Sequence, residues 1–182
     1  MSIVSATKYY SGHSDVMGGS LAINKKLFKK VELSQKAIGS RLGPDDAYLI
    51  IRGLRTLDIR LDKHQQNALK IAKFFSKQRK VKEVFYPFKK NTNQYKMWKK
   101  YYSGASGLMG IKVLSKNKNS VIKFLNKLKL FSYGYSWGGF ESLALYQDKL
   151  ALGNRSYTKL NNNEHIISCL LYTSPSPRDL ST

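Results

Sequence analysis

The sequence is poor in cysteine and in acidic side chains. Cys169 is the only cysteine among 182 residues, so the chain cannot form an internal disulfide. Only 11 aspartate and glutamate residues are present. No spacing of cysteine and histidine is typical of a zinc site, and we therefore expect no bound metal.

The sequence also lacks an apolar run of about 20 residues, the length that a helix needs to cross a bilayer. It shows no secretory leader pattern. We therefore expect a soluble protein of the cytoplasm that has no membrane partner.

Basic residues dominate the charge. The 32 lysine and arginine residues give a formal net charge of +21, which favours attraction to nucleic acid. The lysines are scattered pairs at helix-like surface positions, such as Lys25-Lys26 and Lys99-Lys100, which indicates a solvated surface without a nucleic-acid partner. A basic nucleic-acid-binding protein stays open as an alternative, and a steep salt dependence of its affinity for duplex DNA would favour it.

Apolar residues alternate between strand and helix periods along the chain, which indicates an α/β layer architecture. Glycine and capping residues at 43–46 predict the start of a helix. This helical segment contains the longest apolar pattern of the chain, which runs from Leu57 to Phe75. His64 lies on that apolar stripe, which predicts a packed core histidine. Arg52 and Arg55 share a helical face, which favours a structural ion-pair site. Strands are predicted at 2–4, 17–24, 81–86, 108–114, 130–133 and 143–146, and further helices at 25–36, 94–102 and 120–128.

Two hydroxyl side chains, Ser5 and Thr7, stand directly before Lys8. An amine that attacks a carbonyl must be neutral, and a lysine reaches that state where burial or positive surroundings favour it. Hydroxyl groups suit an anionic ligand such as a phosphate. Because alternate residues of a strand face opposite sides, the strand must end in a turn for all three side chains to reach one ligand.

The pattern Ser-Ala-Thr-Lys-Tyr-x-x-Gly-His-Ser-Asp-x-x-x-Gly at residues 5–19 resembles the cofactor-lysine signature of the Cys/Met-metabolism family of pyridoxal-phosphate (PLP) enzymes. The resemblance extends to about residue 167. It implies that Lys8 holds PLP as an imine and that Ser5 and Thr7 bind the cofactor phosphate. His13 and Asp15 are expected to stabilise the turn.

A second pattern, Tyr-Ser-Trp-Gly-Gly-x-Glu-Ser-Leu at residues 135–143, resembles the substrate end of the cofactor site in that family. Tyr135, Ser136 and Trp137 are therefore the expected substrate-binding residues, and Ser136 and Trp137 could also help to fix Lys8. Members of the family that act at the γ carbon usually have leucine in place of Trp137. Members that cleave cystathionine at its β carbon have Tyr-Ser-Trp-Gly-Gly.

The resemblance implies a fold-type-I PLP enzyme, with the end of the large PLP-binding domain at residues 1–54 and a smaller C-terminal α/β domain at residues 55–167. The implied reaction is α,β-elimination of L-cystathionine to homocysteine, pyruvate and ammonia, a transsulfuration step of methionine biosynthesis. A γ-lyase, γ-synthase or sulfhydrylase of the same family is the nearest alternative. The implied assembly is a homotetramer built from dimers, and the substrate is a small amino-acid thioether.

In that family the lysine motif lies near the middle of the polypeptide, so we expect the chain to be roughly the C-terminal half of an enzyme and to be inactive by itself. Residues 168–182 fit no periodic element and resemble the translation of a sequencing adapter, so we expect them to lie outside the fold. The family pattern has an arginine that binds the substrate carboxylate where this chain has Ser168.

Overall fold

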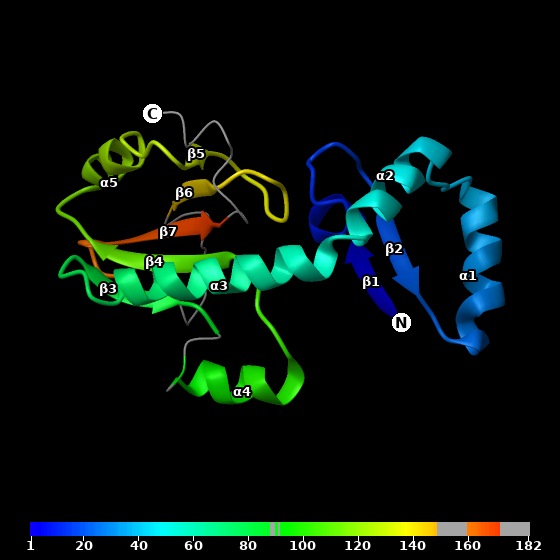
Figure 1. The fold of residues 1–182 in the computed structure, drawn as a ribbon, viewed down its shortest axis with the longest axis horizontal. Helices are drawn as coiled ribbons and strands as arrows, with labels where there is room; N and C mark the ends of the chain where they lie inside the picture. Colours follow the sequence, from blue (N-terminus) through cyan, green and yellow to red (C-terminus); the bar gives the residue numbers. More distant parts are fainter. Residues whose placement is uncertain (88–89, 91, 149–159, 172–182) are drawn as a thin grey trace. The chain divides into compact units, whose positions relative to one another are not determined.

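The computed structural model of the protein describes residues 1–87, 90, 92–148 and 160–171. Contacts divide the chain into two compact units (Figure 1). The first unit contains Met1–Asp58 and, from much later in the sequence, Gly138–Phe140. The second contains Ile59–Trp137 and Glu141–Thr182. The domain organisation expected from the family resemblance stays a prediction.

The first unit opens with an antiparallel hairpin. Strand β1 (Ser2–Ser5) pairs with β2 (Gly19–Ala22), and Ile3 lies opposite Leu21. A short π-helical turn, η1 (Ala6–Tyr10), follows β1 directly. The strands predicted at 2–4 and within 17–24 are confirmed.

Two helices complete this unit. The Asn24 side chain caps α1 (Lys25–Ile38) by accepting a hydrogen bond from the Leu27 backbone N–H over 3.1 Å. Gly39 ends this helix in the left-handed conformation, with φ of 71°. The second helix, α2 (Pro44–Leu54), begins with a proline and carries Asp45 and Asp46 in its first turn.

The helical pattern predicted from residue 43 to Phe75 is in fact two helices. Helix α2 ends at Leu54, and α3 (Leu57–Phe75) begins three residues later. Between them, the Thr56 hydroxyl donates to the Gly53 carbonyl over 3.3 Å, and the Thr56 backbone N–H donates to the same oxygen over 3.2 Å. These bonds close the last turn of α2 and separate the two helices.

The second unit is built on a five-stranded sheet with the order β3-β4-β7-β6-β5. All neighbouring strands are antiparallel except β5 and β6, which are parallel. The remaining helices are α4 (Asn93–Tyr101) and α5 (Lys118–Leu125). The strands are β3 (Val81–Phe85), β4 (Leu108–Leu114), β5 (Ser132–Tyr133), β6 (Leu143–Gln147) and β7 (Glu164–Leu170).

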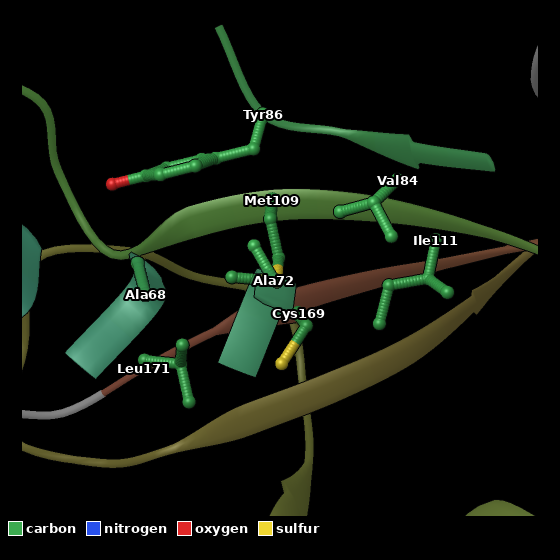
Figure 2. Packing of buried hydrophobic residues seen from close by; sticks show 8 residues of the cluster. All are labelled: Ala68, Ala72, Val84, Tyr86, Met109, Ile111, Cys169 and Leu171. Carbon is green, nitrogen blue, oxygen red and sulfur yellow. The ribbon is translucent and has the colours of Figure 1, made fainter. Parts of the chain in front are cut away.

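Helices α3 and α5 bury their apolar residues against this sheet. Ala68 and Ala72 of α3 pack with Met109 and Ile111 of β4 in one cluster, as Figure 2 shows. Small residues on the helix let it approach the sheet closely. A second cluster joins Val121 and Leu125 of α5 to residues of β6 and β7, namely Ala144, Tyr146 and Ile167.

Strand β7 corrects two sequence-based expectations. No strand was predicted beyond residue 146, yet β7 is the middle strand of the sheet and pairs with β4 and β6. Residues 168–182 were expected to lie outside the fold, and this is wrong for residues 168–171. Ser168 pairs with Gly110 and Leu145, and Cys169 and Leu171 are buried in the core. The rest of that segment, residues 172–182, lies outside the described residues.

His64 is a packed core histidine, as predicted. Its side chain is 1% exposed, and Nδ1 forms a short hydrogen bond with the Leu171 carbonyl. Burial lowers the pKa of His64 below its ordinary value, while the bond to Leu171 partly opposes that effect. The histidine therefore stabilises the fold by satisfying a buried carbonyl next to Gly107, whose backbone also contacts Leu171.

A buried carboxylate stands at the start of β7. Glu164 is 2% exposed and forms an ion pair with Lys82, the residue at which β3 has a bulge. The Asn161 backbone N–H also donates to Glu164 over 3.1 Å. The hydrogen bond from Lys82, followed by that from Asn161, lowers the pKa of Glu164.

Of the helices in the described part of the chain, none has both the length and the apolar character that crossing a membrane requires.

Candidate functional site

Lys8 lies in a tight turn at the end of strand β1. The strand ends at Ser5, so Thr7 and Lys8 lie in η1 and are not part of the extended segment. Within η1 the backbone departs from helical geometry at Lys8, with φ of −92° and ψ of −114°. Ser5 is exposed, whereas Thr7 and Lys8 are half-buried. Ser5, Thr7 and Lys8 therefore lie within four consecutive residues at the end of β1.

Gly18 holds the start of this turn. The backbone N–H groups of Ala6 and Thr7 donate to the Gly18 carbonyl over 2.9 and 3.2 Å. The Thr7 hydroxyl accepts from the Gly18 backbone N–H over 2.9 Å and donates to its carbonyl over 3.3 Å. The longer bond to the carbonyl is the weaker of the two.

Ser11 closes the other end of the turn, and the sequence reasoning did not single it out. Its side chain is fully buried, and its hydroxyl donates to the Thr7 carbonyl over 3.0 Å. The Ser11 and Gly12 backbone N–H groups donate to the carbonyls of Ala6 and Lys8 over 3.0 and 2.8 Å. Hydrogen bonds therefore fix the backbone on both sides of Lys8.

Helix α2 packs its Gly53 directly on this turn. An added β-carbon at Gly53 would lie 2.2 Å from the Ser11 carbonyl oxygen and 2.4 Å from that of Tyr10. Such contacts are too short for any side chain, so only glycine lets the helix come this close. A glycine inside a helical pattern was the one sequence signal for this contact.

Asp15 and His13 each contact another group near the lysine turn. Asp15 forms an ion pair with Arg52 of α2 at 3.3 Å, as expected for the structural role of this arginine. His13 Nδ1 lies 2.6 Å from the Ser11 carbonyl. Both side chains of the Asp15–Arg52 pair are partly exposed, so the ion pair contributes little to stability.

The second sequence motif brings Gly138 against the lysine turn. Gly138 is buried, with φ of 79°, and an added β-carbon would lie 2.6 Å from the Tyr9 nitrogen and 2.8 Å from the Lys8 carbonyl carbon. Residues from two motifs that are 130 positions apart thus meet within the first unit. Gly138 thus lets the backbone of this motif approach the backbone of the lysine turn closely.

The three predicted substrate residues come just before Gly138, in the connection between β5 and β6. Tyr135 is 84% exposed, Trp137 is 45% exposed and Ser136 is half-buried. They belong to the second unit. Their role in binding substrate stays a prediction.

The donor set of the lysine turn fits PLP. The cofactor carries an aldehyde, which a primary amine can bind, and a phosphate, which hydroxyl groups can bind. Lys8 supplies the amine, and Ser5 and Thr7 supply hydroxyls next to it. Gly138 packs its backbone on this turn, and Gly18 holds the start of the turn through backbone hydrogen bonds.

A groove of about 970 Å³ lies in the second unit, between α4 and the sheet. Its lining includes Met97, Trp98 and Tyr101 of α4, together with Phe85 and Ser168. Among the described residues that line it, none belongs to the predicted cofactor or substrate residues. Ser168, which also lines the groove, stands where the family pattern has the arginine expected to bind the substrate carboxylate.

Comparison with known protein families gives a match that covers most of the chain. A family model described as Cys/Met metabolism PLP-dependent enzyme matches residues 1–164. The chain is 37% identical over 146 residues to a cystathionine beta-lyase of Haemophilus influenzae, which covers 80% of this chain and 37% of that protein. It is also 37% identical over 145 residues to the cystathionine gamma-lyase of Homo sapiens, covering 79% of this chain and 36% of that one.

Solved structures of related enzymes have a similar fold. A cystathionine gamma synthase from Xanthomonas oryzae superposes with a TM-score of 0.82 and 29% identity, covering 98% of this chain and 46% of the other. This likeness confirms the α/β fold class predicted from the sequence. The chain spans a little over a third of the length of the two curated relatives.

Proposed function

Because the chain belongs to the Cys/Met metabolism family of PLP-dependent enzymes, we propose that it is part of a carbon–sulfur lyase acting on L-cystathionine. The proposed reaction is α,β-elimination, which releases homocysteine, pyruvate and ammonia, as a transsulfuration step of methionine biosynthesis in the cytoplasm. The observation that carries the proposal is the turn that holds Lys8 next to Ser5 and Thr7.

Each residue of the lysine turn has a distinct part in this proposal. The Lys8 amine would hold the cofactor through its aldehyde and would take the proton from the substrate α carbon. PLP, when bound, supplies an electron sink for the charge left on that carbon. Ser5 and Thr7 would donate hydrogen bonds to the cofactor phosphate. Thr7 is suited to this because its hydroxyl is already oriented by Gly18.

Trp137 supports β elimination over γ chemistry. The residues Tyr135, Ser136 and Trp137 match the pattern of family members that cleave at the β carbon. The relative from Haemophilus influenzae carries the name cystathionine beta-lyase. The polar Ser136 and the partly exposed indole of Trp137 would bind the substrate carboxylate or orient Lys8.

A γ-lyase or γ-synthase is the second candidate, because the similarity to curated relatives does not separate it from the β-lyase. The human cystathionine gamma-lyase is as similar to this chain as the Haemophilus protein is, at 37% identity in both cases. The full-length protein would distinguish the two reactions through its products from L-cystathionine. Pyruvate supports the β-lyase, whereas 2-oxobutyrate supports the γ-lyase.

A labelling experiment tests the cofactor role of Lys8 directly. The protein would be incubated with PLP, reduced with borohydride, digested and mapped by mass spectrometry. We expect the label at Lys8 in the wild type and in the control Lys26→Arg, whose lysine lies exposed on α1, and no label in Lys8→Arg. A label spread over surface lysines, or unchanged in Lys8→Arg, would contradict the proposal.

The homotetramer of paired dimers is part of the same proposal. Light scattering of the full-length protein would measure its mass in solution. A monomeric mass would refute the proposed tetramer. It would not affect the proposed role of Lys8, which the labelling experiment tests separately.

A further inference from the structure

Gly138 is the point at which a distant segment touches the backbone of Lys8 itself. Its three nearest atoms, measured from an added β-carbon, are the Tyr9 nitrogen at 2.6 Å, the Lys8 carbonyl carbon at 2.8 Å and the Lys8 Cα at 3.2 Å. All three are backbone atoms, so no rotation of a side chain could make room for a larger residue. Gly138 therefore fixes how close the segment and the lysine turn lie.

The same turn is held from a second direction by Gly53. The β-carbon position of Gly53 faces the carbonyls of Tyr10 and Ser11, which follow Lys8 in the chain. Two glycines from α2 and from the 138–140 segment therefore contact consecutive parts of one turn. Hydrogen bonds from Gly18 and within the turn complete the set of restraints.

A restraint on the Lys8 backbone matters because the turn is not a regular helix there. At Lys8 the backbone leaves helical geometry, and the Gly12 backbone N–H donates to the Lys8 carbonyl over 2.8 Å. The direction of the Cα–Cβ bond of Lys8 depends on this local geometry. A shift of the backbone would carry the amine away from the position that binds a cofactor.

We propose that Gly138 is a positioning residue for Lys8, which sets the place of the lysine amine by packing its bare backbone on residues 8 and 9. The inference rests on the proposed function of Lys8 as the cofactor lysine. In this role Gly138 contacts the backbone of the lysine turn and does not contact the substrate.

Three alanine variants separate the packing effect from other effects of removing a glycine. Gly138→Ala introduces both the clash and a side chain at positive φ. Gly39→Ala has nearly the same φ, 71°, but has no atom within 4 Å of the added carbon, so it measures the backbone effect alone. Gly134→Ala lies in the same connection and meets only the Leu143 side chain at 3.5 Å.

Two measurements would be made on each variant. Hydrogen exchange would follow the Ser11 and Gly12 amides, which report on the turn without any cofactor. The rate at which PLP becomes attached to Lys8 would be followed by absorbance and by borohydride mapping. In Gly138→Ala we expect exchange to rise and the attachment rate to fall, each on the order of tenfold, with both control variants close to the wild type.

Unchanged exchange in Gly138→Ala would overturn the inference. Faster exchange with a wild-type rate of PLP attachment would also overturn it, because the turn would then move without affecting Lys8. If the wild type itself takes up no PLP at Lys8, the proposed function fails. In that case faster exchange confined to residues 6–12 would still support the positioning of the lysine turn by Gly138.

Discussion

Replacing Gly53 by alanine should destabilise the first unit, although the same change in an open helix stabilises it. In a helix interior, alanine is favoured over glycine by about 1 kcal/mol. At Gly53 the new carbon would meet the Ser11 and Tyr10 carbonyl oxygens at 2.2 and 2.4 Å. Overpacking typically costs about 1–3 kcal/mol, and two rigid backbone groups place this site near 3. We therefore expect a net loss of about 2 kcal/mol.

Native-state hydrogen exchange measures this loss where it arises. A loss of about 2 kcal/mol corresponds to roughly 30-fold faster exchange of α2 and lysine-turn amides that open together with the unit. The control is Gly19→Ala in β2, where the nearest atom to the added carbon is the Val4 carbonyl oxygen at 4.0 Å. That variant should gain about 0.5 kcal/mol. If Gly53→Ala were as stable as the wild type, the contact between α2 and the turn would be refuted.

Further predictions concern the second unit and its ionisable groups. His64→Leu should lower the free energy of unfolding by about 1–3 kcal/mol, measured in urea, because the Leu171 carbonyl loses its partner. Since the pKa of His64 is lowered by folding, wild-type stability should fall as pH drops below about 6.5 and level off below the folded pKa, and this dependence should vanish in the variant. The Lys82 ion pair lowers the pKa of Glu164, so its stabilisation is present above the ordinary glutamate pKa and is lost as pH falls through the lowered one. Lys82→Met should be less stable at neutral pH and less sensitive to acid, and equal acid unfolding curves would contradict this. Burial raises the pKa of the Cys169 thiol to about 12, so a thiol reagent should label it only after unfolding, and rapid labelling of the native protein would show the prediction to be wrong.

Local patterns in the sequence predicted the regular elements with good accuracy where one face of the element is exposed. The strand predicted at residues 108–114 is β4, and the helix predicted at residues 25–36 lies within α1. The stripe that contains His64 also placed that side chain in the core. In each case the alternation of apolar and polar residues carries the information, because it reflects which side of the element is buried.

The middle strand could not be recognised in this way. Six of the seven residues of β7 are buried, so this strand shows no alternation, and its second half resembled a foreign tail. Ile167 and Cys169 of β7 pack into the clusters formed with α5 and α3, and β4 and β6 pair with its two edges, which only the assembled sheet provides. Ser168, Cys169 and Leu171 are held in the fold for the same reason.

By itself the sequence determined the chemistry available at the candidate site, because an amine at Lys8 flanked by hydroxyls at Ser5 and Thr7 is a property of neighbouring residues. Tertiary structure alone decided how that lysine is held. Gly53 and Gly138 lie 45 and 130 positions after Lys8, and their contacts with its turn exist only because the folded backbone brings them within van der Waals distance. Glycine carries no side-chain signal of its own in a sequence, so its role becomes visible only when the groups packed against it are known.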